Sequence, residues 1–122
     1  MKKIFLTSCL FVLVSTLSNQ ELLAKTNSDN VLLVHKTPTC GCCRMWVEHL
    51  KMNGLKANTQ DHENLDEIKK MYGIKPQYRS CHTAISKDGY IFEGHIPSKY
   101  ITQFLSENHP NAIGLSVPGM PM

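Results

Sequence analysis

The 122-residue sequence predicts an α/β fold with a mixed sheet, in the element order β-α-β-α-β-β-α. Residues 31–34 are a continuous apolar run, which is typical of a strand buried on both faces. The sequence Lys87-Asp88-Gly89 lies between two short apolar runs and predicts a hairpin. Between these two features, apolar residues recur at the spacing of one helix face: Cys43, Trp46, Val47 and Leu50.

Residues 1–24 are expected to be a secretory signal peptide. A basic pair precedes an apolar stretch over residues 4–17, and Ala24 offers a small residue for cleavage. This stretch is shorter than the roughly 20 apolar residues that a membrane-spanning helix needs. We therefore expect an exported, periplasmic protein whose mature chain, residues 25–122, has no membrane segment. Cys9 leaves with the signal, and the remaining cysteines are Cys40, Cys42, Cys43 and Cys81.

Residues 25–122 are enough for one domain with a modest core. We expect its folded core to span residues 31–109, followed by an irregular tail over residues 110–122 that Gly and Pro interrupt. The formal net charge is only +3 and the basic residues are scattered. This charge distribution argues against a nucleic-acid binder, which would need a concentrated basic patch.

After the first strand, a helix is expected over residues 42–53, because Asn53-Gly54 supplies a C-terminal stop. A weaker alternating strand follows over residues 55–61. A second helix is expected over residues 64–72. The apolar face of this second helix would consist of Leu65, Ile68, Met71 and Tyr72.

The predicted hairpin consists of strands over residues 81–85 and 90–92, and a third helix over residues 98–108 begins with Ser98 as its cap. The inward face of this helix would consist of Tyr100, Ile101, Phe104 and Leu105. A strand-helix-strand unit implies parallel strands, and the hairpin adds antiparallel ones. This order is that of a thioredoxin-like fold, in which the loop after the first strand runs into the first helix.

That loop carries the sequence Cys40-Gly41-Cys42-Cys43. Cys40 and Cys43 have the C-x-x-C spacing of a redox pair at a helix N-terminus, where the helix dipole favours a thiolate. Gly41 is expected to let the backbone turn sharply, so that Cys40 and Cys42 face one space. Cys43 should be the least exposed cysteine of the loop, and a pure packing role beside Trp46 is the alternative for it.

Cys81 and His82 open the predicted hairpin, which lies beside the cysteine loop in a thioredoxin-like sheet. Side chains alternate along a regular strand, so only one of the two should face the loop, and Cys81 is favoured. His82 is either a further ligand or an ordinary hydrogen-bonded histidine. Thiolates with one imidazole suit Cu(I) or Zn(II), and bridging sulfurs allow more than one Cu(I). The candidate ligands are Cys40, Cys42, Cys43, Cys81 and His82.

Three other histidines are interpreted as solvated or core-packed rather than as ligands: His35, His49 and His95. Met120 in the tail offers a thioether that suits Cu(I), but a terminus of this kind is usually disordered. Two alternatives to copper binding stay open. A thiol–disulfide oxidoreductase would use Cys40 as nucleophile and Cys43 as resolving thiol. A structural zinc domain is less well matched, because three ligands within four residues depart from the usual paired spacing.

Five motifs together resemble the CopG family of exported copper-resistance proteins. They are TPTCGCC at 37–43, WVEHL at 46–50, SCHTA at 80–84, EGHIP at 93–97 and GLSVPGMP at 114–121. The resemblance implies a thioredoxin-like fold, a periplasmic location, and copper bound by the cysteines at 40, 42, 43 and 81 with His82 beside them. It also implies a copper oxidoreductase role, interconverting Cu(I) and Cu(II), or supply of copper to an efflux or oxidase system.

Overall fold

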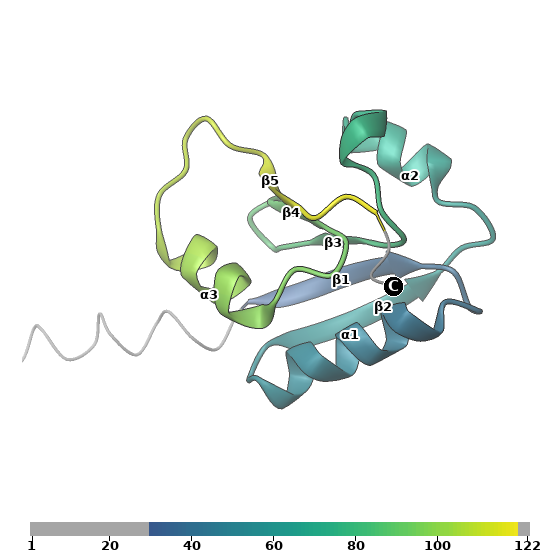
Figure 1. The fold of residues 1–122 in the computed structure, drawn as a ribbon. Helices are drawn as coiled ribbons and strands as arrows, with labels where there is room; N and C mark the ends of the chain where they lie inside the picture. The colour runs from purple at the N-terminus through teal and green to yellow at the C-terminus, as the bar shows by residue number, and fades with distance from the viewer. Residues whose placement is uncertain (1–29, 120–122) are drawn as a thin grey trace, which may run out of the picture.

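Five strands form one mixed sheet in the order β2-β1-β3-β4-β5 in the computed structural model, which describes residues 30–119 (Figure 1). The expected signal peptide, Cys9 and Met120 lie outside these residues. The predicted thioredoxin-like α/β class is confirmed, with one strand more than expected. In chain order the elements are β1 (Val31–Lys36), α1 (Gly41–Met52), β2 (Lys56–Asp61), α2 (Asp66–Met71), the 3₁₀ helix η1 (Pro76–Tyr78), β3 (Thr83–Ile85), β4 (Ile91–Glu93), α3 (Ser98–Ser106) and β5 (Gly114–Ser116).

The additional strand, β5, lies in the segment that was expected to be irregular. It pairs in parallel with β4, while β3 is antiparallel to both β1 and β4, and β1 is parallel to β2. The Ile91 N–H donates to Ile113 O at 2.8 Å, and the Val117 N–H donates to Glu93 O at 2.9 Å. A three-residue strand shows too little side-chain alternation for sequence detection, because backbone pairing with β4 defines it.

The larger core lies between the sheet and the two helices α1 and α3. The predicted inward face of α1 is confirmed, since Cys43, Trp46, Val47 and Leu50 are all buried. From α3, Ile101 and Phe104 enter the same core. The sheet residues that they cover are Leu32, Val34, Ala84 and Phe92. This packing holds the N-terminal end of α1, and therefore the cysteine loop, in a fixed position against the sheet.

The opposite face of the sheet is covered only in part. The expectation that residues 31–34 are buried on both faces is wrong at Leu33, whose side chain is 38% exposed. On this face Ile74, just after α2, packs on Ile85 and Ile91 in a smaller cluster. α2 is six residues long, too short to shield the whole face.

Two helices bury residues other than those predicted. In α2, Met71 is 72% exposed whereas Lys69 is buried. Lys69 tolerates burial because its ammonium pairs with the Glu93 carboxylate and donates to the Thr83 hydroxyl at 2.9 Å. In α3, Tyr100 is 48% exposed, so the predicted inward face is narrower than expected.

The N-terminus of α3 also differs from the prediction. Pro97 occupies the N-cap position and makes no side-chain cap, and Ser98 is already helical. The Ser98 N–H instead donates to His49 Nε2 of α1 at 3.2 Å. His49 therefore satisfies one of the free N–H groups of α3 and joins the two helices that cover the core. Within residues 30–119, no helix is both long and apolar enough to cross a bilayer.

Candidate metal centre

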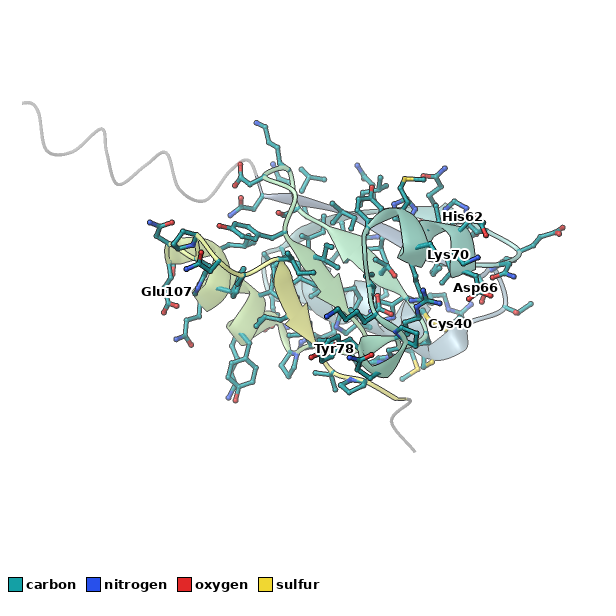
Figure 2. The ribbon with its side chains drawn as sticks, turned by 90° about the horizontal axis from the view of Figure 1, so that it is seen from above. Cys40, His62, Asp66, Lys70, Tyr78 and Glu107 are labelled. Carbon is teal, nitrogen blue, oxygen red and sulfur yellow. A yellow bond between two sulfur atoms is a disulfide. The ribbon has the colours of Figure 1, made fainter. Side chains whose placement is uncertain are left out.

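The cysteines of the loop and of the hairpin meet at the N-terminal end of α1, and Figure 2 shows sulfur atoms gathered beside Cys40. Cys40 is the N-cap residue of α1, and its Sγ accepts a hydrogen bond from the Cys43 N–H at 3.3 Å. The Sγ atoms of Cys40, Cys42, Cys43 and Cys81 all lie within 4.8 Å of one another. The fold thus brings together one loop and one hairpin that are far apart in the sequence.

Two of these cysteines are oxidised and two are free. Cys40 and Cys43 form a disulfide, while Cys42 and Cys81 are thiols. The Sγ atoms of Cys40 and Cys42 are 3.5 Å apart. Cys43 is completely buried and the other three are partly exposed, so the prediction that Cys43 is the least exposed cysteine of the loop is confirmed. The C-x-x-C pair is therefore already closed, with two thiols beside it.

His82 and His95 extend the cluster on the side of Cys81. The Cys81 Sγ lies 3.4 Å from His82 Nδ1 and 3.6 Å from His95 Nδ1. Each of the three residues offers a ligand atom within 4.8 Å of the others. The expectation that only one of Cys81 and His82 faces the cysteine loop, with Cys81 favoured, is confirmed. Among the described residues, Cys81 is grouped with the three loop cysteines, whereas His82 is grouped with Cys81 and His95.

His95, which the sequence predicts to be solvated or core-packed, lies with its Nδ1 3.6 Å from Cys81 Sγ. The register of the hairpin explains its position, since β3 and β4 pair Thr83 with Glu93. Continuing this antiparallel register by two residues places Cys81 opposite His95, and the Gly94 N–H donates to His82 O at 3.1 Å. The predicted hairpin could have indicated the position of His95, because the turn that joins two strands determines which of their residues lie opposite one another.

Residues 78–122 match a family described as "Protein of unknown function, DUF411". Two solved structures, described as "Copper resistance protein copG" Form 1 and Form 2, each match at 33% sequence identity with a TM-score of 0.70. Each match covers 77% of this chain and 73% of the other chain. The chain belongs to the CopG family. No curated protein matches it.

In this CopG-family chain, Gly41 does not act as expected. It is the first residue of α1, and its φ is not positive. A Cβ added at this position would meet no atom within 4 Å. Cys40 and Cys42 therefore approach one another through the ordinary geometry of a helix start, without a turn that requires glycine.

His82 is fully buried against Trp46, with the two ring centroids 4.2 Å apart. The Trp46 indole is itself held by its Nε1–H, which donates to Ile96 O at 2.8 Å. Burial, together with the neighbouring His95, lowers the pKa of His82 to about 3. The imidazole is therefore neutral at neutral pH, which is the form that binds a metal.

The two histidines retain unused donor atoms. The Nε2 atoms of His82 and His95 are buried and have no hydrogen-bond partner in the part of the chain that the structure describes. Burial raises the pKa of the Cys81 thiol. Metal binding at Cys81 would therefore release a proton.

The backbone next to Cys81 is anchored by the buried carboxylate of Glu93. This carboxylate accepts hydrogen bonds from the Ser80 N–H at 2.7 Å and from the Thr83 hydroxyl at 2.6 Å, and it pairs with Lys69 of α2. The Ser80 hydroxyl also donates to Gly119 O at 2.5 Å. The residue before Cys81 is thus fixed from two directions, which restricts where its sulfur can lie.

His35 belongs to neither group of ligand atoms found within residues 30–119. Its Nδ1 lies 2.9 Å from His62 Nε2, and its ring is close to Tyr72. Burial, with a smaller effect of His62, lowers the pKa of His35. The interpretation of His35 as a packed residue therefore agrees with its surroundings.

Proposed function

We propose that this protein binds copper at the centre formed by Cys40, Cys42, Cys43 and Cys81, with His82 beside them. The observation that carries the proposal is the convergence of four sulfur atoms within 4.8 Å. Thiolates are soft ligands that favour Cu(I), and a sulfur shared between ions allows the reduced cluster to hold more than one. A hard, oxygen-preferring ion such as Mg²⁺ would find no matching ligands in this set.

We further propose that the protein interconverts Cu(I) and Cu(II). The Cys40–Cys43 disulfide supports this proposal, because it shows that the pair can be closed within the cluster. Two Cu(II) substrate ions would each take one electron from the Cys40 and Cys43 thiolates. The products would be two Cu(I) ions and the disulfide, so that atoms and electrons balance.

The expected signal peptide and the family suggest that this chemistry serves copper resistance in the periplasm. The two similar structures are described as copper resistance proteins. We propose that Cu(I) released from the cluster is passed to a copper efflux or oxidase system. Detection of the mature chain in the periplasmic fraction, and not in the cytoplasmic fraction, would test the location.

The copper proposal is tested by titrating the fully reduced protein with Cu(I) against a chromogenic Cu(I) chelator. We expect at least one equivalent of Cu(I) to be retained, and fewer equivalents or weaker binding in Cys81→Ser. Met52→Leu is a matched control, because it removes a soft sulfur atom that is 79% exposed and belongs to the last residue of α1, whereas the cysteines lie at the start of that helix. Equilibrium dialysis that leaves the reduced wild-type protein without copper would overturn the proposal.

The alternative function, a general thiol–disulfide oxidoreductase using Cys40 and Cys43, gains no support from the similar structures. Both functions use the same disulfide, so its presence does not distinguish them. Reduction of a dye-labelled disulfide substrate separates the two, since it needs no copper. We expect no rate above that of a Cys40→Ser variant.

A further inference from the structure

A cavity of about 450 Å³ lies between the segment that follows α2 and the strands β4 and β5. Ile74 and Ile91, which belong to the smaller apolar cluster, form part of its lining. Tyr78 and Ile113 also line it, although their side chains are 50% and 65% exposed. Among the described residues, no cysteine or histidine lines this cavity. Its volume falls within the range of about 300–1,000 Å³ that small-molecule sites occupy, and it is separate from the metal centre.

The walls of the cavity are held together by specific contacts. The Ser116 hydroxyl donates to Tyr78 O at 2.6 Å and thereby joins β5 to η1, and Figure 2 shows Tyr78 beside β5. Gly114 of β5 pairs with Ile91 of β4, and a Cβ at position 114 would lie 1.7 Å from Ile91 O. The close approach of the two strands therefore requires glycine, and no side chain from this position fills the space above Ile91.

Two hydrogen-bond donors lie at the edge of the cavity. Lys75 and Tyr78 both line it, and the Tyr78 N–H donates to Lys75 O at 2.9 Å across the turn of η1. Side chains three residues apart in a 3₁₀ turn lie on the same side of it. In the part of the chain that the structure describes, neither the Lys75 ammonium nor the Tyr78 hydroxyl has a hydrogen-bond or ion-pair partner. An ammonium and a hydroxyl are donors that a carboxylate accepts from.

The charge of the lining also favours an anion. Glu93 lines the cavity too, but its buried carboxylate is paired with Lys69 and accepts hydrogen bonds from the Ser80 N–H and the Thr83 hydroxyl. Lys75 is thus the one charged side chain of the described lining without an ionic partner. A ligand with an apolar body and a single negative group matches such a site, whereas a cation would be repelled.

We propose that this cavity binds a small amphipathic carboxylate, namely a free medium-chain alkanoate. Its hydrocarbon chain covers Ile74, Ile91 and Ile113, and its carboxylate accepts hydrogen bonds from the Lys75 ammonium and the Tyr78 hydroxyl. Burial of the exposed apolar surface of Ile113 and Tyr78 supplies the favourable free energy. The site uses no ligand of the copper centre, so the inference does not depend on the proposed function.

The probe is decanoate, kept below the concentration at which it forms micelles and titrated into the oxidised, metal-free protein. Backbone amide NMR signals report where it binds, and we expect saturation at one equivalent with the largest shifts in residues 73–78 and 113–116. Decanol and decylammonium have the same chain with a neutral and a positive head, and should bind at least about 3-fold more weakly. Octanoate lacks two methylenes and should bind about 4- to 15-fold more weakly than decanoate.

Variants at the two donors test the position of the carboxylate. Lys75→Gln and Tyr78→Phe change exposed side chains, and each should weaken decanoate binding about 3- to 10-fold while leaving decanol binding unchanged. Lys99→Gln is the matched control, because Lys99 is an exposed lysine that lies over the ring of Tyr100 and outside the cavity.

Decanoate binding that does not saturate, or that is equal in the Lys75→Gln, Tyr78→Phe and Lys99→Gln variants, would overturn the inference. Two other occupants have distinct signatures. Shifts of the same amide signals on raising the protein concentration alone would assign the cavity to a second copy of the chain. Tighter binding of trileucine than of decanoate would assign it to the C-terminus of an apolar peptide. Either result would also overturn the inference.

Discussion

The buried ion pair between Lys69 and Glu93 provides a quantitative test of how the centre is supported. The two side chains are 6% and 1% exposed, and the carboxylate also accepts hydrogen bonds from Ser80 and Thr83. Lys69→Met removes the ammonium with little change in shape and leaves the carboxylate charge in a buried site. Loss of one partner of a buried pair costs about 3–5 kcal/mol. Since a domain of this size is stable by about 5–15 kcal/mol, we expect a large fraction of the stability to be lost.

The free energy of unfolding would be measured by urea titration of the oxidised, metal-free protein, with the single, buried Trp46 as fluorescent probe. The control is Lys70→Met in the same helix. Its ion pair with Glu67 joins side chains that are 63% and 84% exposed, so about 0–1 kcal/mol is expected. The double variant Lys69→Met/Glu93→Gln should recover part of the loss, because no buried charge remains. Equal losses in the Lys69 and Lys70 variants would refute the reasoning.

Three further predictions concern acid stability, one glycine and the tryptophan. The pKa of His82 is about 3 in the folded protein, against an ordinary value of 6.5 in the unfolded chain. As the pH falls from 6.5 to 5, the His82 imidazole of the unfolded chain therefore takes up a proton, whereas that of the folded protein stays neutral. The contribution of His82 to the free energy of unfolding is therefore complete above pH 6.5, and the protein should lose about 2 kcal/mol of stability between that range and pH 5. Urea titrations of the metal-free protein at about pH 7.5 and pH 5 measure this loss. The loss should be smaller in His82→Gln than in the wild-type protein. Gly94→Ala should lower the free energy of unfolding by about 1–3 kcal/mol, because φ of Gly94 is +84° and the new Cβ would lie 2.4 Å from the backbone oxygen of Val117. Gly41→Ala should be neutral or stabilising by about 0.5 kcal/mol, because its Cβ would meet no atom within 4 Å. Thermal unfolding of the two variants would compare them. Trp46→Phe removes the hydrogen bond to the buried Ile96 carbonyl and should lower the free energy of unfolding by about 1–3 kcal/mol. Unfolding would be followed by circular dichroism. A loss no larger than that of a variant at an exposed site would contradict the assigned hydrogen bond.

The sequence was sufficient for those parts of the fold that depend on side-chain periodicity. The inward face of α1 was predicted residue by residue, because a twelve-residue helix repeats its apolar pattern often enough to be read. Short elements gave less information. β5 has three residues and is defined by backbone pairing, and Lys69 is buried because of a partner that lies 24 positions away. The sequence pattern within one segment does not indicate which distant residue that segment pairs with.

The same distinction applies to the centre. Cys40, Cys42 and Cys43 adjoin one another in the sequence, so their clustering was visible directly. The position of Cys81 beside them followed from the thioredoxin-like order of the elements. His95 required a finer argument, since its place depends on the register of a hairpin rather than on the order of strands. The closed Cys40–Cys43 disulfide likewise could not be chosen from the sequence, which left the oxidation state of the cysteines open.

Cys81 is the residue that the two groups of ligand atoms share. It lies within reach of the three loop sulfurs and of both histidine Nδ1 atoms, whereas His95 is grouped only with Cys81 and His82. A change of oxidation state at Cys40 and Cys43 alters the ligands on one side of this sulfur without altering those on the other.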